Sequence, residues 1–153
     1  MNLTISSESK SNMKSLIEKI AAVYQILTDA HEVSPWTQEQ IENDLMSKDV
    51  DYFFAYDQEK IIGFLSLQQL VGELEITNIA VLKAYQGKGV GSHLLTHLVD
   101  YNLPIFLEVR ESNLAAQALY QKYDFKVVGH RRDYYRNPTE GALLMKREGE
   151  NER

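Results

Sequence analysis

Three glycines stand close together at Gly87, Gly89 and Gly91, within the segment 86–92 (QGKGVGS). Glycine adopts backbone conformations that let several N–H groups turn toward one point, where an anion can bind. A helical apolar pattern follows, and the dipole at a helix N-terminus also favours an anion. The spacing matches neither the P-loop nor the dinucleotide-binding fingerprint. By its residues alone, the segment fits a phosphate site or a tight, closely packed turn.

Two residues further along the chain have side chains suited to proton transfer. Glu108 alternates with apolar residues in the strand-like segment 104–110 (PIFLEVR), so its carboxylate points away from the core face. Tyr120 follows Asn113 by seven residues in the helix-like segment 112–123, which places both on one helix face. The structural alternatives are an ion pair for Glu108, a core aromatic for Tyr120 and a helix cap for Asn113.

The elements that must position these residues follow from apolar periodicity. Short turns between residues 51 and 82 predict an antiparallel meander, and Thr37 is expected to cap a helix. The pattern predicts strands at 2–6, 51–56, 61–71, 73–82, 104–110, 125–131 and 142–147, and helices at 13–27, 37–46, 86–101 and 112–123.

This order predicts an α/β (α+β) fold, a mixed, mostly antiparallel central sheet of six to seven strands flanked by about four helices. We expect residues 1–153 to form one domain, with 148–153 as a frayed tail. The first helix is expected to bury Met13, Leu16, Ile17, Ile20, Tyr24 and Leu27. The third is expected to bury Val90, Leu94, Leu95, Leu98 and Val99.

The composition narrows the class of function. The 153 residues include 44% hydrophobic and 25% charged residues, typical of a soluble globular protein. A net charge of −6 disfavours nucleic-acid binding, although arginines and tyrosines gather at 131–136, and it suits a basic peptide partner. With no cysteine, thiolate catalysis and cysteine-ligated metals are excluded. His93 and His97 lack a third ligand, so no metal is expected.

The sequence also contains no apolar run near the length of about 18 residues that a membrane span requires. Its first residues lack the apolar region of a secretory signal. We therefore expect a cytoplasmic protein without a membrane partner.

Residues 86–91 follow the pattern Q-x-x-G-x-G, which resembles the pyrophosphate-binding signature of the GCN5-related N-acetyltransferases (GNAT). The preceding segment 78–81 (NIAV) resembles that family's fourth strand. Within the family, the chain is most similar to the RimI-type ribosomal-protein-alanine N-acetyltransferases, over about residues 31–147. The segments that carry this closer resemblance are Pro35-Trp36, Leu107–Arg110, Ser112-Asn113, Ala118–Tyr120 and Arg132–Tyr135.

The resemblance implies direct acetyl transfer from acetyl-CoA to an amine, best assigned to the N-terminal alanine of a small-subunit ribosomal protein. It implies that Glu108 accepts a proton and that Tyr120 protonates the departing CoA thiolate. It places the stretch 132–135 beside the acceptor peptide. The implied acetyl-CoA contacts are Ile79, Ala80, Val81, Gln86, Gly87, Lys88, Gly89, Val90, Gly91, Ser92 and Asn113.

Three alternatives stay open at this point. In the first, the acceptor is a small-molecule amine in place of a protein. In the second, the chain binds acyl-CoA without catalysis. In the third, Glu73 and Glu75 supply the base in place of Glu108. Amine chemistry favours an N-terminal acceptor, because an α-amine has a pKa of about 7.7–8.0 against about 10.4 for lysine.

The chain also departs from the family pattern. Lys83 stands where the family often has proline, and Asp124 stands where a glycine is usual after the catalytic helix. Asp124 is therefore expected to adopt the left-handed conformation. Trp36 is expected to anchor a loop, with a place in the substrate pocket as the alternative.

Overall fold

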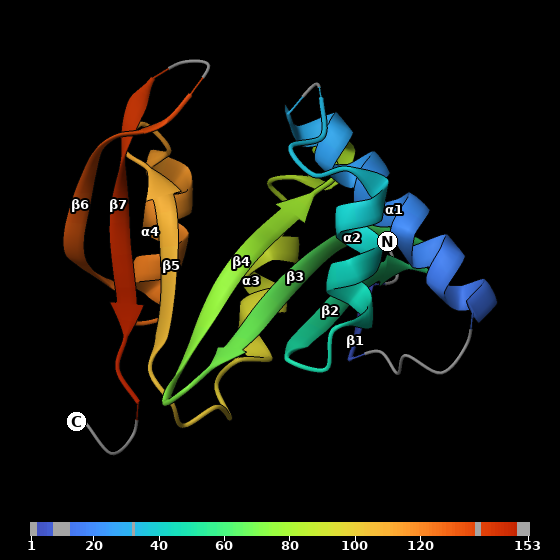
Figure 1. Ribbon diagram of the computed structural model, residues 1–153, viewed down its shortest axis with the longest axis horizontal. Helices are drawn as coiled ribbons and strands as arrows, with labels where there is room; N and C mark the ends of the chain where they lie inside the picture. The colour runs from blue at the N-terminus through green and yellow to red at the C-terminus, as the bar shows by residue number, and fades with distance from the viewer. Residues whose placement is uncertain (1–2, 8–12, 32, 137–138, 150–153) are drawn as a thin grey trace.

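The computed structural model describes residues 3–7, 13–31, 33–136 and 139–149 (Figure 1). Its strands form one sheet in the order β1-β2-β3-β4-β5-β7-β6. All neighbouring strands are antiparallel except β4 and β5, which are parallel, so the predicted mixed sheet is confirmed. The strands are β1 (Leu3–Ser7), β2 (Val50–Asp57), β3 (Lys60–Leu70), β4 (Glu73–Val81), β5 (Ile105–Arg110), β6 (Lys126–Tyr135) and β7 (Glu140–Arg147).

Helices cover both faces of this sheet (Figure 1). The helices α1 and α2 lie on one face, and α3 and α4 lie on the other. Thr37 begins α2 with the predicted cap, since its hydroxyl accepts a hydrogen bond from the backbone of Gln40 at 3.1 Å. The helices are α1 (Met13–His31), α2 (Gln38–Met46), α3 (Val90–Thr96) and α4 (Leu114–Lys122), with a short 3-10 turn η1 (Lys83–Tyr85).

The predicted core face of α1 is partly wrong. Ile17 is 62% exposed and Tyr24 is exposed as well. Apolar residues surround most of this helix, so several overlapping faces satisfy helical spacing, and packing against β3, β4 and α2 selects one. The buried residues of α1, within its described side chains, are Leu16, Lys19, Val23, Ile26 and Leu27.

The predicted core face of α3 is wrong at one residue. Val99 is 61% exposed, whereas Val90, Leu94, Leu95 and Leu98 are buried. The helix ends at Thr96, so helical spacing no longer places Val99 toward the core.

The sheet opens between β4 and β5. The two strands pair only near their starts, at Leu74 with Ile105 and Glu75 with Phe106. Farther along β4 the register with β3 shifts and leaves Thr77 as an extra, bulged residue. Bulges bend a strand and increase its twist. Figure 1 shows β4 and β5 diverging toward their carboxyl ends, so the hydrogen-bonded sheet ends where the site begins.

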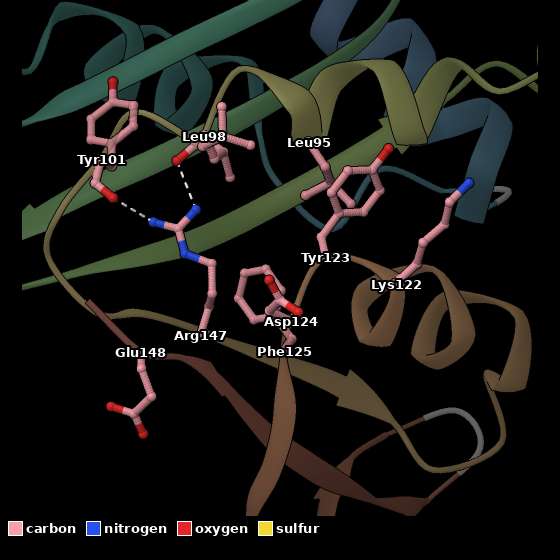
Figure 2. Close-up of a pocket in the computed structure, with 10 residues that line it drawn as sticks. Leu95, Leu98, Tyr101, Lys122, Tyr123, Asp124, Phe125, Arg147 and Glu148 are labelled. Atoms are coloured by element: carbon pink, nitrogen blue, oxygen red, sulfur yellow. Dashed lines mark hydrogen bonds between the residues drawn. The ribbon is translucent and has the colours of Figure 1, made fainter. Parts of the chain in front are cut away.

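The end of β7 is tied to the segment that follows α3. The buried Arg147 side chain donates hydrogen bonds to the carbonyls of Leu98 at 2.7 Å and Tyr101 at 2.6 Å (Figure 2). A cavity of about 190 Å³ lies beside this guanidinium, between α3 and the end of α4. Arg147 therefore satisfies carbonyls that follow the last turn of a helix.

Beyond β7, Gly149 is buried, and a Cβ there would lie 2.3 Å from the carbonyl oxygen of Asn102. This packing differs from the frayed tail expected from residue 148, and residues 150–153 lie outside the described part. Asp124, after α4, has the expected positive φ of 71°. Within the described residues, none of the helices combines the length and the apolar character needed to cross a membrane.

Candidate active site

A cavity of about 550 Å³ lies between the end of α1, the end of β4, the glycine-rich segment and α4. Small residues on its wall keep the cavity open. At Gly91, for example, an added Cβ would lie only 3.2 Å from Leu119 Cδ2. We call it the glycine cavity. Its lining consists of Ala30, His31, Ile79, Ala80, Val81, Tyr85, Gln86, Gly87, Gly89, Val90, Gly91, Ser92, Asn113, Ala115, Ala116, Leu119 and Tyr120.

The glycine-rich segment adopts the backbone that its composition predicts. Gly87 and Gly89 have φ of 77° and 84°, in the left-handed region that favours glycine. The Gln86 side chain donates to the carbonyl of Val81 at 2.9 Å, which closes the loop against the end of β4. The first N–H groups of a helix have no partner within that helix, so this end of the cavity suits an anion.

A second cavity of about 690 Å³ lies between the diverging strands β4 and β5. We call it the strand cavity. The bulge at Thr77 forms part of its β4 wall. Its lining consists of His31, Val33, Pro35, Ile76, Thr77, Asn78, Ile79, Leu107, Glu108, Val109, Arg110, Asn113, Tyr120, Tyr135 and Arg136.

The two cavities share His31, Ile79, Asn113 and Tyr120, so they meet at these residues. Tyr120 is only 7% exposed and packs edge-on against Phe125. Burial, and then the neighbouring Tyr135, raise the pKa of the Tyr120 phenol. The Tyr120 hydroxyl is therefore protonated at neutral pH.

Asn113 has the capping role considered from the sequence. Its Oδ1 accepts a hydrogen bond from the backbone N–H of Ala116 at 3.1 Å at the start of α4. Asn113 also lines both cavities, so the cap holds this amide at the place where they meet.

Glu108 lies on the wall of the strand cavity with its side chain 17% exposed. Its Oε1 is 3.7 Å from Nη2 of Arg131 on β6, a cross-strand ion pair. Its Oε2 is buried and accepts no hydrogen bond within the described residues. Arg110, the nearer candidate partner in sequence, pairs instead with Glu140.

Glu75 lies near Glu108 on the neighbouring strand. Burial, followed by the negative charges of Glu108 and Glu73, raises the pKa of the Glu75 carboxyl. Neither Glu73 nor Glu75 lines either cavity. Of these three carboxylates, Glu108 is therefore the one that lies on a cavity wall.

All the residues predicted to contact the cofactor line the glycine cavity except Lys88, whose side chain is exposed. Trp36 lines neither cavity but a separate small pocket with Gln40 and Asp44, and its neighbour Pro35 lines the strand cavity. No group of three metal-ligating side chains occurs in the part of the chain that the structure describes.

Sequence patterns do not identify His31 or Thr77 as site residues. His31 ends α1 and reaches the site only because that helix crosses β4. Polar and apolar residues alternate along β4 until the two consecutive polar residues Thr77 and Asn78, and this interruption was the available signal for Thr77. The positive φ of Gly87 and Gly89, in contrast, is expected directly from the glycines in the sequence.

Comparison with known proteins agrees with this geometry. A family model described as the acetyltransferase (GNAT) family matches residues 20–125. The ribosomal protein bS18-alanine N-acetyltransferase of Haemophilus influenzae is 36% identical over 145 residues, which cover 86% of this chain and 97% of that protein.

Solved structures have the same fold. The ribosomal-protein-S18-alanine N-acetyltransferase of Escherichia coli has a TM-score of 0.82 at 32% identity, and the match covers 98% of both chains. A GNAT family acetyltransferase of Elizabethkingia anophelis with acetyl-CoA bound has a TM-score of 0.72 at 22% identity, covering 96% of this chain and 98% of that one. The second likeness concerns the fold alone.

Proposed function

Because the chain belongs to the acetyltransferase (GNAT) family, we propose that it transfers the acetyl group of acetyl-CoA to the N-terminal α-amine of a ribosomal protein that begins with alanine. The names of the H. influenzae and E. coli relatives support this acceptor, and the similarity covers nearly the whole of both proteins. A ribosomal acceptor would place the reaction in the cytoplasm, as the sequence predicts.

The glycine cavity fits acetyl-CoA. The loop and helix start at 86–92 offer backbone N–H groups to the pyrophosphate, and the end of β4 at 79–81 offers main-chain groups to the pantetheine arm. The E. anophelis protein holds acetyl-CoA on the same fold. Acetyl-CoA supplies the acetyl group as a thioester.

One observation carries the proposal: the glycine cavity and the strand cavity meet at Tyr120 and Asn113, with Glu108 on the wall of the strand cavity. An amine in the strand cavity would attack the thioester carbon, forming the N–C bond. The C–S bond then breaks, the amine proton passes to Glu108 directly or through water, and the CoA thiolate takes the proton of Tyr120. No acyl-enzyme is needed, and the chain has no cysteine to form one.

The acceptor class follows from amine chemistry and charge. An α-amine has a pKa of about 7.7–8.0, so a substantial fraction is neutral at pH 7–8 and one carboxylate suffices as the base. The net charge of −6, with Glu73, Glu75 and Glu108 on neighbouring strands, favours a cationic peptide over an acidic one.

The test uses the purified full chain, acetyl-CoA and an alanine-initiated basic peptide that also contains lysine. We expect mass spectrometry to find one acetyl group, on the α-amine, and calorimetry to find acetyl-CoA binding. Glu108→Gln should lower kcat by roughly 10²-fold or more, as expected when a general base is lost. Glu111→Gln is the matched control, because Glu111 is an exposed carboxylate in the turn that follows β5 and lines neither cavity.

Three outcomes would contradict the proposal in different ways. Binding with acetylation only of free amines or of lysine would overturn the acceptor. Binding with no transfer to any amine would indicate an acyl-CoA-binding module. Absence of acetyl-CoA binding would overturn the assignment of the glycine cavity.

A further inference from the structure

His31 is the one residue with a titratable imidazole where the two cavities meet. It ends α1, so it approaches the junction from a different element than Tyr120 and Asn113, which belong to α4 and its cap. It lines both the glycine cavity and the strand cavity. Glu108 lines only the strand cavity. Given the proposed function, His31 therefore lies where the thioester carbonyl and the attacking amine must meet.

His31 is an exposed residue whose surroundings favour the neutral form of its imidazole. Partial burial of the ring first, and then the positive charge of Arg110, lower the pKa of His31 below its usual value of 6.5. Besides Arg110, the ionisable side chains lining the cavities are Glu108, Tyr135 and Arg136 in the strand cavity, Tyr85 in the glycine cavity, and Tyr120 in both. A neutral imidazole carries one N–H donor and one acceptor nitrogen.

We propose that the His31 imidazole donates a hydrogen bond to the carbonyl oxygen of the bound thioester and to the oxyanion that forms from it. When the amine nitrogen bonds to the carbonyl carbon, the C=O π pair moves onto this oxygen. When the C–S bond breaks, the same pair restores the carbonyl of the new amide. His31 keeps its proton throughout, while Glu108 and Tyr120 handle the protons of the amine and the thiolate.

The donor role fits the site better than a second base. A protonated His31 would be a second cation near Arg110, and partial burial together with this charge lowers the pKa of His31. A neutral imidazole with a lowered pKa can still polarise a carbonyl by donating its N–H. A donor aimed at a developing oxyanion stabilises the transition state more than the ground state.

The test compares His31→Phe, which keeps a planar ring without a donor, with His31→Gln, which keeps an N–H donor but cannot act as a base. We expect kcat to fall by about 10²-fold in His31→Phe and to stay within about fivefold of wild type in His31→Gln, as for loss and retention of one oxyanion donor. Acetyl-CoA affinity should change much less than kcat, because the hydrogen bond strengthens as the oxyanion forms. His93→Phe, which removes an imidazole on α3 outside both cavities, is the matched control.

An infrared measurement reads the same contact without an acceptor amine. With acetyl-CoA labelled with ¹³C at the thioester carbonyl, we expect a lower carbonyl stretching frequency on wild type and His31→Gln than on His31→Phe. Equal frequencies on all three proteins, or a His31→Gln variant as slow as His31→Phe, would overturn the donor role.

The measurements distinguish a wrong acceptor from a wrong role for His31. If the frequency shift is present but the alanine peptide is not acetylated, the proposed acceptor is wrong and His31 remains the donor. If wild type does not bind acetyl-CoA, both proposals are overturned.

Discussion

The guanidinium of Arg110 and the carboxylate of Glu140 form an ion pair of 2.9 Å that joins the end of β5 to the start of β7. Arg110 also donates to the carbonyl of Arg136 at 3.0 Å and lies over the ring of Tyr135, 4.4 Å from its centre. Both Tyr135 and Arg136 line the strand cavity. Arg110, fixed by its ion pair with Glu140, therefore holds Tyr135 and Arg136 beside β5 as one wall of the strand cavity.

Glu140→Gln should weaken this wall in a pH-dependent way. The hydrogen bond from Arg110 lowers the pKa of Glu140 below its usual value of 4.5, so the pair stabilises the fold above that value and loses its effect as pH falls through the lowered pKa. We expect the melting temperature of the variant to lie below wild type at pH 7 and to approach it below pH 4.5. A gap that persists unchanged in acid would contradict this assignment. Glu59→Gln, in the exposed turn between β2 and β3, is the control.

Tyr120→Phe should separate chemistry from cofactor binding. Loss of a positioned proton donor costs about 10²–10⁴-fold in rate, whereas the ring that packs on Phe125 is retained. We expect kcat to fall within that range, with acetyl-CoA affinity by calorimetry close to wild type. Because burial raises the pKa of the phenol, wild type should lose no activity through Tyr120 between pH 7 and about 10. Turnover equal to that of the exposed control Tyr24→Phe would rule out the role.

Arg131→Met should strengthen binding of a basic acceptor. Arg131 neutralises part of the charge of Glu108, and its side chain is 56% exposed, so the pair is worth at most about 1 kcal/mol. We expect KM for a basic alanine peptide to fall by up to about fivefold at low salt, and the gain to disappear at high salt. Lys126→Met removes the same charge from an exposed position at the start of β6 and is the control. A gain of equal size in that variant would show a general charge effect.

Gly89→Ala should weaken both the fold and cofactor binding. No atom lies within 4 Å of a Cβ at this position, so the cost comes from the positive φ of 84° alone. We expect unfolding free energy from urea titration to fall by about 1–2 kcal/mol and the Kd of acetyl-CoA to rise. Gly89→Asn should recover part of both losses, because asparagine tolerates this backbone. Equal losses in Gly89→Ala and Gly89→Asn would show that the added side chain itself, and not the positive φ, causes the effect.

Arg147→Met should destabilise the protein without changing the site. The substitution keeps the apolar packing but removes the donors to the carbonyls of Leu98 and Tyr101 (Figure 2). Buried carbonyls left without donors cost about 1–3 kcal/mol, and we expect a loss of that size in urea unfolding. Arg147→Lys should lose less. Acetyl-CoA affinity should be unchanged, and a large change would link this corner of the fold to the glycine cavity.

The sequence by itself determined the local features of this protein. The alternation at 105–110 placed Glu108 on the face opposite the core, as observed. The turn at Gly87 and Gly89 and the cap at Thr37 were also predicted from neighbouring residues, whereas the left-handed Asp124 was expected from the family resemblance. Each depends on the sterics and hydrogen bonds of a few neighbouring residues, which the sequence states directly.

Only the tertiary structure decided which distant residues meet. The bulge at Thr77 and the short pairing of β4 with β5 open the strand cavity, and the path of α1 brings His31 to Tyr120. The same holds for the pairing of Glu108 with Arg131 and for the buried face of α1. These contacts join residues far apart in the chain, so they depend on sheet twist and on how whole elements pack, which local sequence patterns do not contain.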